Sequence, residues 1–392
     1  MNASPQTLHL QTLQRQGIDS LRRGEPLAAR QLFEQAALAA PGDATVQLGL
    51  AYACTALNDH PAALVAVDAA LRADPRMLRA LLLKGDLMAA TADERAAAAF
   101  YQAALQVLPA DAQLPADLGL AVQRARQALE QLSNRFEGLI RGRLAASPAS
   151  QRPRSARFEQ SLDLLVGKQQ LYLQAPKLYC LPGLPHIAFF ERQLFPWMDA
   201  LEAQTVAIRE ELLALLQQPD RFAPYLERDA ARPVLNDAGL LDNADWSACY
   251  LWRNGAPVEP NASRCPRTLA ALADLPMPRI PGRAPNILFS QLKPGAHIPP
   301  HNGFVNTRLI VHLPLVVPSG CFFRVGNETR EWQAGKAWAF DDTIEHEARN
   351  TSGQTRVVLL FEIWRPELSE DERAQVSALF EAIGQDQGDW GV

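Results

Sequence analysis

The sequence lacks the cysteine pattern of a disulfide-stabilised protein. Its five cysteines are an odd number, are widely spaced and contain no CxxC pair. This usage favours free thiols in a reducing compartment, so we expect a cytoplasmic protein. One pairing, between Cys249 and Cys265 across a short loop, remains open at this stage.

Long apolar runs and an excess of positive charge are also missing. The opening residues MNASPQTLHLQTLQRQG have neither a basic segment nor an apolar core, so we expect no secretory signal. No apolar run approaches the length that crosses a bilayer, so we expect no membrane span. A net charge of −5 provides no basic field for nucleic acid or an anionic membrane surface.

The chain does contain enough residues for two domains with separate cores: 392, of which 48% are hydrophobic. Its first third is rich in Ala and Leu, which favours helix. Residues 142–158 are small, basic and proline-containing and indicate a boundary. From Asn286 onward, short runs of Val, Ile, Leu and aromatic residues alternate with turn residues, which is typical of an antiparallel barrel or jelly roll. Helical periodicity marks 201–218, and an N-cap Ser369 followed by an acidic first turn marks a final helix over 369–383.

Several positions in the first third recur every 34 residues. The recurring sets, with the small residues expected where paired helices approach, are Pro41, Pro75 and Pro109; Ala29, Ala63 and Ala97; Phe33, Val67 and Tyr101; Ala36, Ala70 and Ala104; and Gly17, Ala51 and Gly85. They resemble tetratricopeptide repeats, in which each helix pair buries its face by stacking on the next. Such an array either offers a concave surface to a peptide or partner protein, or only braces the rest of the chain.

Two of the expected strands carry isolated arginines. Side chains alternate across a strand, so Arg308 shares one face of RLIVHL with His312, and Arg356 shares one face of TRVVLLFEIW with Glu362. On a covered face an arginine requires an anionic partner, whereas on a solvated face it requires none, and both alternatives are open. A barrel mouth lined by arginines would suit a small dicarboxylate.

The stretch PGAHIPPHNGF places His297 and His301 four residues apart. Pro299 and Pro300 exclude a helix there, so the two histidines do not form a helical metal pair. Most non-heme iron oxygenases use two histidines and a carboxylate. In the usual barrel version that carboxylate follows the first histidine by two residues, but here Gly303 stands in its place. Taken alone, this glycine counts against iron.

A longer comparison reverses that judgement. Residues 289–368 closely resemble the aspartyl/asparaginyl β-hydroxylases, a family of Fe(II)- and 2-oxoglutarate-dependent dioxygenases, above all in GNETREWQAGKAWAFDDTIEHE. Weaker similarity reaches residue 176 through LYCLPGLPHIAFF and WSACYLWRNG. The resemblance implies a double-stranded β-helix of jelly-roll or cupin type with flanking helices over 176–392. Residues 141–175 would connect it to tetratricopeptide-like helical repeats over 1–140.

The resemblance also implies the metal ligands. In this family two histidines hold the iron without a protein carboxylate, and His301 and His346 match them, while Gly303 matches the family's glycine. His297 matches a histidine outside the iron site, and we expect it to make a hydrogen bond in a loop.

Four further residues receive implied roles in binding the cosubstrate and the substrate. Ser290 and Arg356 match residues that bind the far carboxylate of 2-oxoglutarate, and His312 lies near its other end. Arg308 matches an arginine close to the substrate. The family's second arginine, two residues further on, is Ile310 here, which removes a positive charge and disfavours an acidic side chain.

As the resemblance implies, we expect a dioxygenase that uses Fe(II), 2-oxoglutarate and O₂ to hydroxylate an Asp/Asn-type side chain of a protein or peptide, releasing succinate and CO₂. The helical repeats would bind part of that substrate. Two alternatives remain: hydroxylation of a fatty-acyl or other small molecule, and a non-catalytic repeat scaffold with a degenerate barrel. The sequence fixes neither the substrate's identity nor the oligomeric state.

Overall fold

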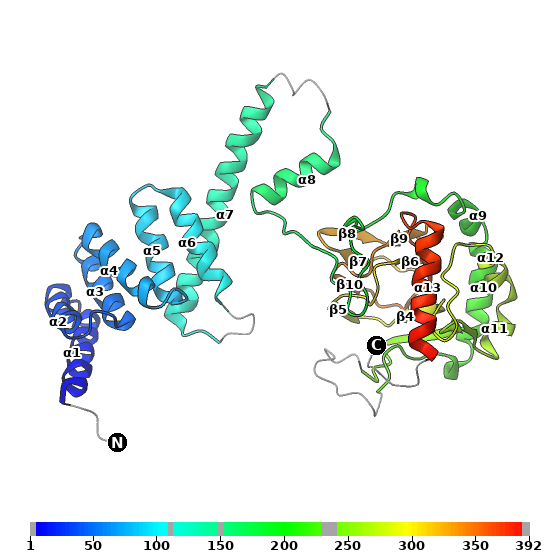
Figure 1. The fold of residues 1–392 in the computed structure, drawn as a ribbon, viewed down its shortest axis with the longest axis horizontal. Coiled ribbons are helices and arrows are strands. Elements are labelled where there is room, and N and C mark those ends of the chain that lie inside the picture. The colour runs from blue at the N-terminus through cyan, green and yellow to red at the C-terminus, as the bar shows by residue number, and fades with distance from the viewer. Residues whose placement is uncertain (1–4, 109–112, 148–152, 229–240, 386–392) are drawn as a thin grey trace. The chain divides into compact units, whose positions relative to one another are not determined.

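The computed structural model describes residues 5–108, 113–147, 153–228 and 241–385 (Figure 1). It divides the chain into two compact units, Met1–Gln169 and Gln170–Val392. The division falls inside the segment 141–175 that was expected to connect two domains. None of the helices in the described residues is both long enough and apolar enough to span a membrane.

The first unit is helical. Its helices are α1 (Pro5–Arg22), α2 (Pro26–Ala39), α3 (Ala44–Ala56), α4 (His60–Ala73), α5 (Leu78–Ala90), α6 (Glu94–Gln106), α7 (Ala116–Ala145) and α8 (Ala156–Leu165). From α1 to α7 each helix packs on the next in the chain. The apolar face of each helix is therefore buried by the neighbouring helices, as in stacked helical repeats.

The predicted 34-residue register is confirmed in the described part of this unit. The recurring alanines and the large residues Phe33, Val67 and Tyr101 are all buried. A Cβ atom at Gly49 would overlap the ring of Phe33, and one at Gly85 would overlap the ring of Tyr101. The predicted small residues mark positions where the two helices of one repeat approach each other. Gly49 was not among them, because it lies where α3 approaches α2 of the preceding repeat. Pro109 lies outside the described residues.

The second unit contains two antiparallel sheets. Their strands are β1 (Ala223–Pro224), β2 (Trp246–Arg253), β3 (Ala256–Pro257), β4 (Ile287–Leu292), β5 (His297–His301), β6 (Arg308–Val316), β7 (Cys321–Val325), β8 (Glu328–Glu331), β9 (Trp338–Phe340), β10 (His346–Asn350) and β11 (Arg356–Trp364). The seven-stranded sheet has the order β1-β2-β4-β11-β6-β9, with β3 paired to β2, and the four-stranded sheet has the order β5-β10-β7-β8. The predicted change from helices to antiparallel strands is confirmed.

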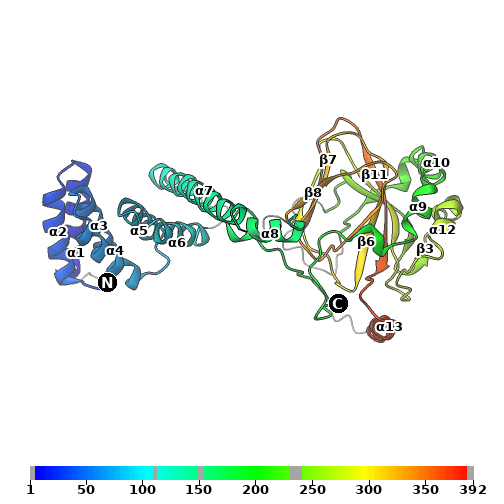
Figure 2. The same ribbon diagram turned by 90° about the horizontal axis from the view of Figure 1, so that it is seen from above.

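Helices flank these sheets. They are α9 (Met198–Ala203), α10 (Thr205–Leu216), α11 (Asn261–Arg264), α12 (Pro266–Leu272) and α13 (Glu370–Gln385), with short 3-10 turns at Arg192–Leu194 and Pro219–Arg221. Both α10 and α13 lie in segments for which the sequence predicted helix. Figure 2 shows α9, α10 and α12 on one side of the strands and β7 and β8 on the other.

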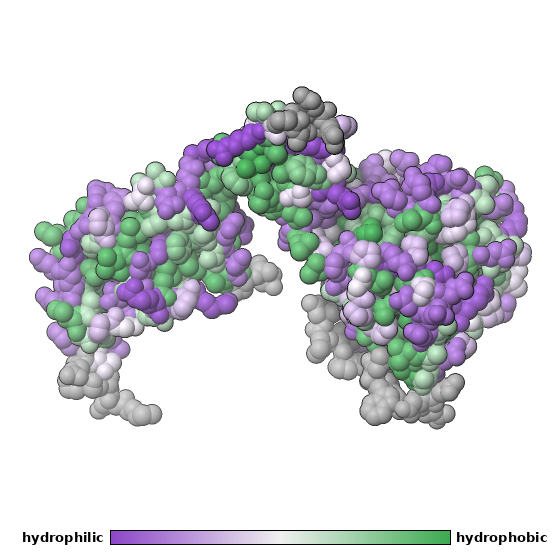
Figure 3. All heavy atoms as spheres, turned by 45° about the horizontal axis from the view of Figure 1, so that its top comes forward, coloured by the Kyte–Doolittle hydropathy of each residue, from purple (hydrophilic) through white to green (hydrophobic). Residues whose placement is uncertain are grey.

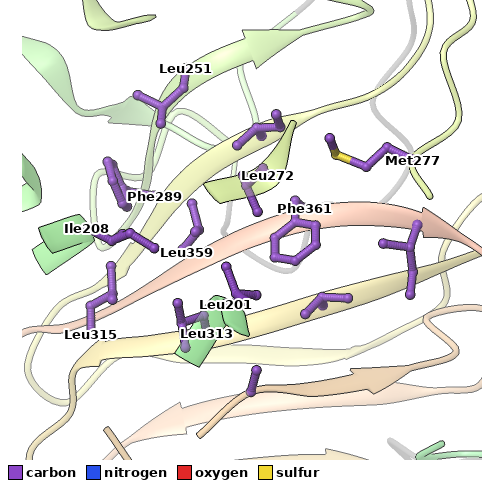
Figure 4. Close-up of a cluster of buried hydrophobic side chains, with 14 of the residues drawn as sticks. Leu201, Ile208, Leu251, Leu272, Met277, Phe289, Leu313, Leu315, Leu359 and Phe361 are labelled. Carbon is purple, nitrogen blue, oxygen red and sulfur yellow. The ribbon is translucent and has the colours of Figure 1, made fainter. Parts of the chain in front are cut away.

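Each face of the seven-stranded sheet has its own core. Phe289, Leu359 and Phe361 face helices α9, α10 and α12, where they pack on Leu201 and Ile208 (Figure 4). The opposite face packs on the four-stranded sheet, through residues that include Trp246, Ile310, Val358, Phe323 and Val325. The seven-stranded sheet is therefore covered on both sides.

The surface seen in Figure 3 mixes hydrophilic and hydrophobic side chains on both units.

The cysteines of the second unit show no disulfide. Cys249 and Cys265 both lie in the helix-covered core, and both are free thiols. Burial raises the pKa of each thiol to about 12. The pairing that the sequence left open is thus absent from the structure.

A fully buried ion pair fixes the loop that leads into β10. Arg365, directly after β11, donates from Nη1 to Asp341 Oδ2 over 2.8 Å, and both side chains are 0% exposed. Asp341 also accepts from the Thr343 amide at 2.9 Å and from Gln174 at 2.6 Å, while Arg365 donates to the carbonyl of Pro185. The pair therefore ties together β11, the loop 341–345 and the segment before α9.

Replacing Arg365 by Met should destabilise the second unit strongly. The change leaves Asp341 buried without its charged partner, which costs about 3–5 kcal/mol of unfolding free energy. All seven tryptophans lie after residue 169, so tryptophan fluorescence during urea unfolding reports on this unit. Arg228→Met, in an exposed ion pair with Asp242, is the matched control and should cost about 1 kcal/mol or less. Equal losses in the two variants would refute a special role for the buried pair.

Candidate active site

Strands β5 and β10 place two histidines opposite each other. His301 and His346 are antiparallel partners at one end of the ladder, and their ring centroids are 4.1 Å apart. Pro299 and Pro300 lie on β5, an edge strand, where a missing backbone donor does not interrupt the sheet. Residues 45 positions apart in sequence thus meet through strand pairing.

Both imidazoles are held with one ring nitrogen available. His301 Nδ1 lies 2.8 Å from the carbonyl oxygen of Pro299, and His346 Nδ1 lies 3.0 Å from that of Ile344. A carbonyl oxygen can only accept, so each Nδ1 carries the proton and each Nε2 keeps its lone pair. Burial lowers the pKa of His301, and burial together with the neighbouring His301 lowers the pKa of His346 to about 3. Neutral imidazoles with a free ring nitrogen are suitable ligands for divalent transition metals.

No carboxylate has room to complete this pair from position 303. A Cβ atom on Gly303 would overlap the carboxylate of Asp342, and the Gly303 amide donates to the Asp342 carbonyl at 2.6 Å. Across the described residues there is no group of three or more His, Cys, Asp or Glu that could hold a metal ion. The described residues therefore bring two histidines together here without a third side chain of these types.

Arg356 is a buried cation that has no counterion among the residues that the structure describes. It is 1% exposed, its Nη1 donates to the Ser290 carbonyl at 3.2 Å, and its guanidinium lies 4.6 Å from the ring centroid of Trp332. Its Nε has no hydrogen-bond partner, and no carboxylate among the described residues pairs with it. Burial lowers its pKa to about 10, so it remains charged near neutral pH. A buried charge of this kind is satisfied by an anionic ligand.

Ser290 and His312 lie beside this cation. Ser290, on β4, accepts a hydrogen bond from Trp246 Nε1 at 3.3 Å, which leaves its hydroxyl proton free to donate. His312 Nδ1 accepts from Trp332 Nε1 at 3.4 Å, so the proton of the neutral ring is on Nε2. Burial, with Arg356 and His346 nearby, lowers the pKa of His312 well below its usual value. Both residues therefore present neutral donors.

All six predicted site residues line one cavity of about 720 Å³. They are Ser290, His301, Arg308, His312, His346 and Arg356. Tyr225, Trp246 and Tyr250 form one of its walls, with the rings of Tyr225 and Trp246 stacked at 4.0 Å. The cavity therefore combines two neutral histidines, a buried cation that pairs with no carboxylate among the described residues, and apolar walls, in a volume typical of small-molecule sites.

Sequence comparisons agree with this geometry. The family described as aspartyl/asparaginyl beta-hydroxylase matches residues 202–366. The aspartyl/asparaginyl beta-hydroxylase of Homo sapiens is 34% identical over 185 residues, 46% of this chain and 23% of that protein. The ornithine lipid ester-linked acyl 2-hydroxylase of Rhizobium tropici is 33% identical over 208 residues, 52% of this chain and 68% of that protein.

This chain belongs to the aspartyl/asparaginyl β-hydroxylase family. Membership supports a hydroxylase function for the second unit. The match spans only 23% of the human relative and 19% of the mouse one. Similar solved structures include the Arabidopsis OM64 TPR domain, at a TM-score of 0.28 and 19% identity over 31% of this chain and 98% of that one. The Yersinia enterocolitica chaperone SycD has a TM-score of 0.31 and 15% identity over 35% of this chain and 90% of that one.

The two arginines of this β-hydroxylase family member differ in their partners. Arg308 is covered, and it pairs with Asp342 at 3.2 Å and with Glu362 at 3.4 Å. Arg356 is covered and has no such partner. The sequence left a solvated face open for both, and the structure excludes it. His297 is outside the cavity, and its Nε2 lies 2.8 Å from Glu347 on the neighbouring strand.

Sequence reasoning missed two features of the family site in this chain. Asp342 received no role of its own from the sequence, but its carboxylate packs against Gly303, and burial raises its pKa to about 6. The aromatic wall was also missed, although Trp246 lies in the WSACYLWRNG segment on which the resemblance was noted. No regular spacing of residues in the sequence reveals either feature, because each joins residues from separate strands or loops.

Replacing Gly303 by Ala should weaken metal binding. The added methyl group displaces the Asp342 carboxylate or β5, with a cost of about 1–3 kcal/mol for the overpacking. Anaerobic titration with Fe(II) measures the affinity, and thermal unfolding measures the stability. Gly353→Ala is the control, because a Cβ atom there meets open space. Gly303→Asp should also bind Fe(II) more weakly than the wild type, and a tighter site in that variant would contradict the steric argument.

Proposed function

We propose that the second unit is an Fe(II)- and 2-oxoglutarate-dependent dioxygenase whose two sheets form a double-stranded β-helix. The observation that carries this proposal is the buried, unpaired Arg356 in the same cavity as two neutral histidines with free Nε2 atoms. A metal and a carboxylate are the two ligands that these groups lack. Family membership supports the same conclusion.

The residues present fit this pair of ligands. His301 and His346 would hold the iron through Nε2, because both Nδ1 atoms are occupied by carbonyl oxygens. Fe(II), when bound, supplies oxidation by O₂ with conversion of 2-oxoglutarate to succinate and CO₂. Arg356 and the Ser290 hydroxyl would bind the far carboxylate of 2-oxoglutarate, and the Nε2–H of His312 would donate a hydrogen bond to the same molecule.

The protein's own contribution is placement and the exclusion of water. Trp332 and Trp246 lie against the cosubstrate-binding residues, and Phe323 and Phe340 pack around His312 and His346. In these apolar surroundings the guanidinium's attraction for a carboxylate is stronger than in water. No side chain is required to act as a general base.

Our first substrate candidate is an Asp/Asn-type side chain of a protein or peptide, as the name of the human relative indicates for that protein. The helical unit would bind part of such a partner, since stacked helix pairs offer an extended surface. We propose a cytoplasmic location, because all five cysteines are free thiols.

A second candidate is a fatty-acyl or other small molecule. The rhizobial relative is named for hydroxylation of a lipid acyl group, and an apolar cavity adjoins the candidate active site. A non-catalytic scaffold is disfavoured by the site itself. Leaving Arg356 buried without a partner would be costly in a barrel that binds no anion.

Anaerobic addition of Fe(II) and then 2-oxoglutarate should give a visible charge-transfer band from the chelate. His346→Ala removes one of two protein ligands and should abolish the band, whereas His297→Ala, outside the cavity, should retain it. Absorption spectroscopy checks both variants. The absence of this absorption band in the wild-type protein would refute the dioxygenase proposal.

Arg356→Met should separate ligand binding from stability. The variant loses the cationic partner of the cosubstrate, so the affinity for 2-oxoglutarate should fall by at least about 30-fold. The free protein should be as stable as the wild type or more stable, because an unpaired buried charge has been removed. Calorimetry and urea unfolding measure the two quantities, with exposed Arg349→Met as the control. Unchanged affinity for 2-oxoglutarate would exclude the assigned role.

A further inference from the structure

The second unit begins with a stretch, residues 170–181, that precedes its helices and strands. We call it the entry segment. It contacts two loops, residues 302–307 after β5 and residues 341–345 before β10. These loops adjoin His301 and His346, the two histidines of the proposed iron site. The proposed binding of iron and 2-oxoglutarate gives the entry segment no role.

Backbone hydrogen bonds join the entry segment to both loops. The Ala175 amide donates to the Thr343 carbonyl at 2.8 Å, and the Lys177 amide donates to the Gly303 carbonyl at 3.0 Å. The next amide along the chain donates to the Phe304 carbonyl at 2.9 Å. One short stretch of backbone therefore holds the loop that precedes one histidine beside the loop that follows the other.

The two loops also bond directly to each other. The Gly303 amide donates to the Asp342 carbonyl at 2.6 Å, and Asn302 Nδ2 donates to the Thr343 carbonyl at 2.8 Å. The Thr343 carbonyl thus accepts from Asn302, which directly follows the first histidine, and from Ala175. The entry segment therefore completes a hydrogen-bond network among the neighbours of both histidines.

Gln174 adds side-chain bonds to the same loops. Its Nε2 donates to Asp341 Oδ2 at 2.6 Å and to the Pro185 carbonyl at 3.0 Å, and its Oε1 accepts from Asn306 Nδ2 at 3.0 Å. Asn306 is fully buried, and its Oδ1 accepts from the Leu181 amide at 2.7 Å. The Gln174 carboxamide thus donates to the loop before β10 and accepts from the loop after β5.

The strand ladder alone defines the position of His301 weakly. Strand β5 is an edge strand, and Pro299 and Pro300 contribute no amide to its pairing with β10. The register of this pairing shifts between His346 and Ala348, next to the point where His301 pairs. The end of β5 that carries His301 therefore depends on contacts outside the ladder, and the entry segment supplies them.

We propose that the entry segment is a positioning element of the iron site, in which the Ala175 and Lys177 amides and the Gln174 carboxamide set the approach of the two histidines. The inference rests on the proposed function, because it concerns the proposed metal ligands. Ala175 and Gln174 lie outside the cavity lining, so they act only through the loops. Lys177 lines the cavity, but its assigned role needs only its backbone amide.

Proline substitution tests the bond from Ala175. Ala175→Pro removes the N–H that binds the Thr343 carbonyl, whereas Ala175→Gly keeps it and is the control at the same position. Anaerobic titration of the full chain with Fe(II) should show an affinity about tenfold lower or less in Ala175→Pro, because outer contacts orient metal ligands. Leu173→Pro should bind Fe(II) like the wild type, since Leu173 is 51% exposed and its amide bonds to no described residue.

A second measurement separates positioning from a general loss of structure. In iron-free protein the proposed 2-oxoglutarate site uses Arg356 and Ser290, so calorimetry should give the same 2-oxoglutarate affinity for Ala175→Pro and the wild type. At saturating Fe(II) the charge-transfer band of the chelate should still be shifted in Ala175→Pro. Equal weakening of Fe(II) and of 2-oxoglutarate would refute a positioning role.

Iron should protect the entry segment in return, because coupling between two sites is reciprocal. Hydrogen exchange in the wild-type protein, followed by mass spectrometry, measures this effect without any substitution. Saturating Fe(II) under anaerobic conditions should slow exchange of the Ala175 and Lys177 amides by about the same tenfold factor. A peptide from α4 of the first unit is the control and should exchange at an unchanged rate.

Two results would overturn the inference and leave the proposed function intact. One is an Fe(II) affinity in Ala175→Pro equal to that of Leu173→Pro, and the other is exchange of the entry segment that iron does not slow. If Ala175→Pro does not fold, the exchange measurement on the wild-type protein decides the question. A failure of the proposed function looks different, because the wild-type protein then binds no Fe(II), which refutes both.

Discussion

The arrangement of the second unit depends on one buried ion pair, Arg365 with Asp341. Two fully desolvated charges are tolerated there because the carboxylate also accepts from Thr343 and Gln174 and the guanidinium also donates to a backbone carbonyl. The pair holds the end of β11 against the loop that enters β10. Since that loop carries Asp342 and ends at His346, the ion pair sets the position of groups that it never touches.

The neighbouring strands β6 and β11 each carry a buried arginine, and the two arginines differ in whether a carboxylate of the described residues neutralises them. On β6, Arg308 is neutralised by Asp342 and Glu362 from within the chain. On β11, Arg356 has only a carbonyl and an aromatic ring as neighbours, so its charge remains to be balanced. Arg356 is thus a buried cation of this cavity whose charge no carboxylate among the described residues balances. It marks a position in the cavity that suits an anion.

The sequence predicted what is periodic and left out what depends on tertiary contacts. The 34-residue register located the buried alanines and Phe33, because each recurs in the same local setting. Strand alternation put Arg308 and Arg356 on polar faces but could not reveal which of them had a counterion. The pairing of His301 with His346 came from the resemblance, since no spacing rule joins residues on β5 and β10. The contact of Gly303 with Asp342 had no signal in the sequence, because it depends on how two loops pack.

That last contact limits how such a site can change during evolution. In the proposed iron site, a substitution of Gly303 that introduced a third ligand would place its side chain against the Asp342 carboxylate. A single loss of Asp342 would leave Arg308 with one carboxylate fewer while adding no ligand. Conversion to a three-ligand site therefore requires at least two coordinated changes, each harmful alone. The packing of Gly303 against Asp342 therefore helps to maintain the two-histidine arrangement, in addition to the chemistry of the site.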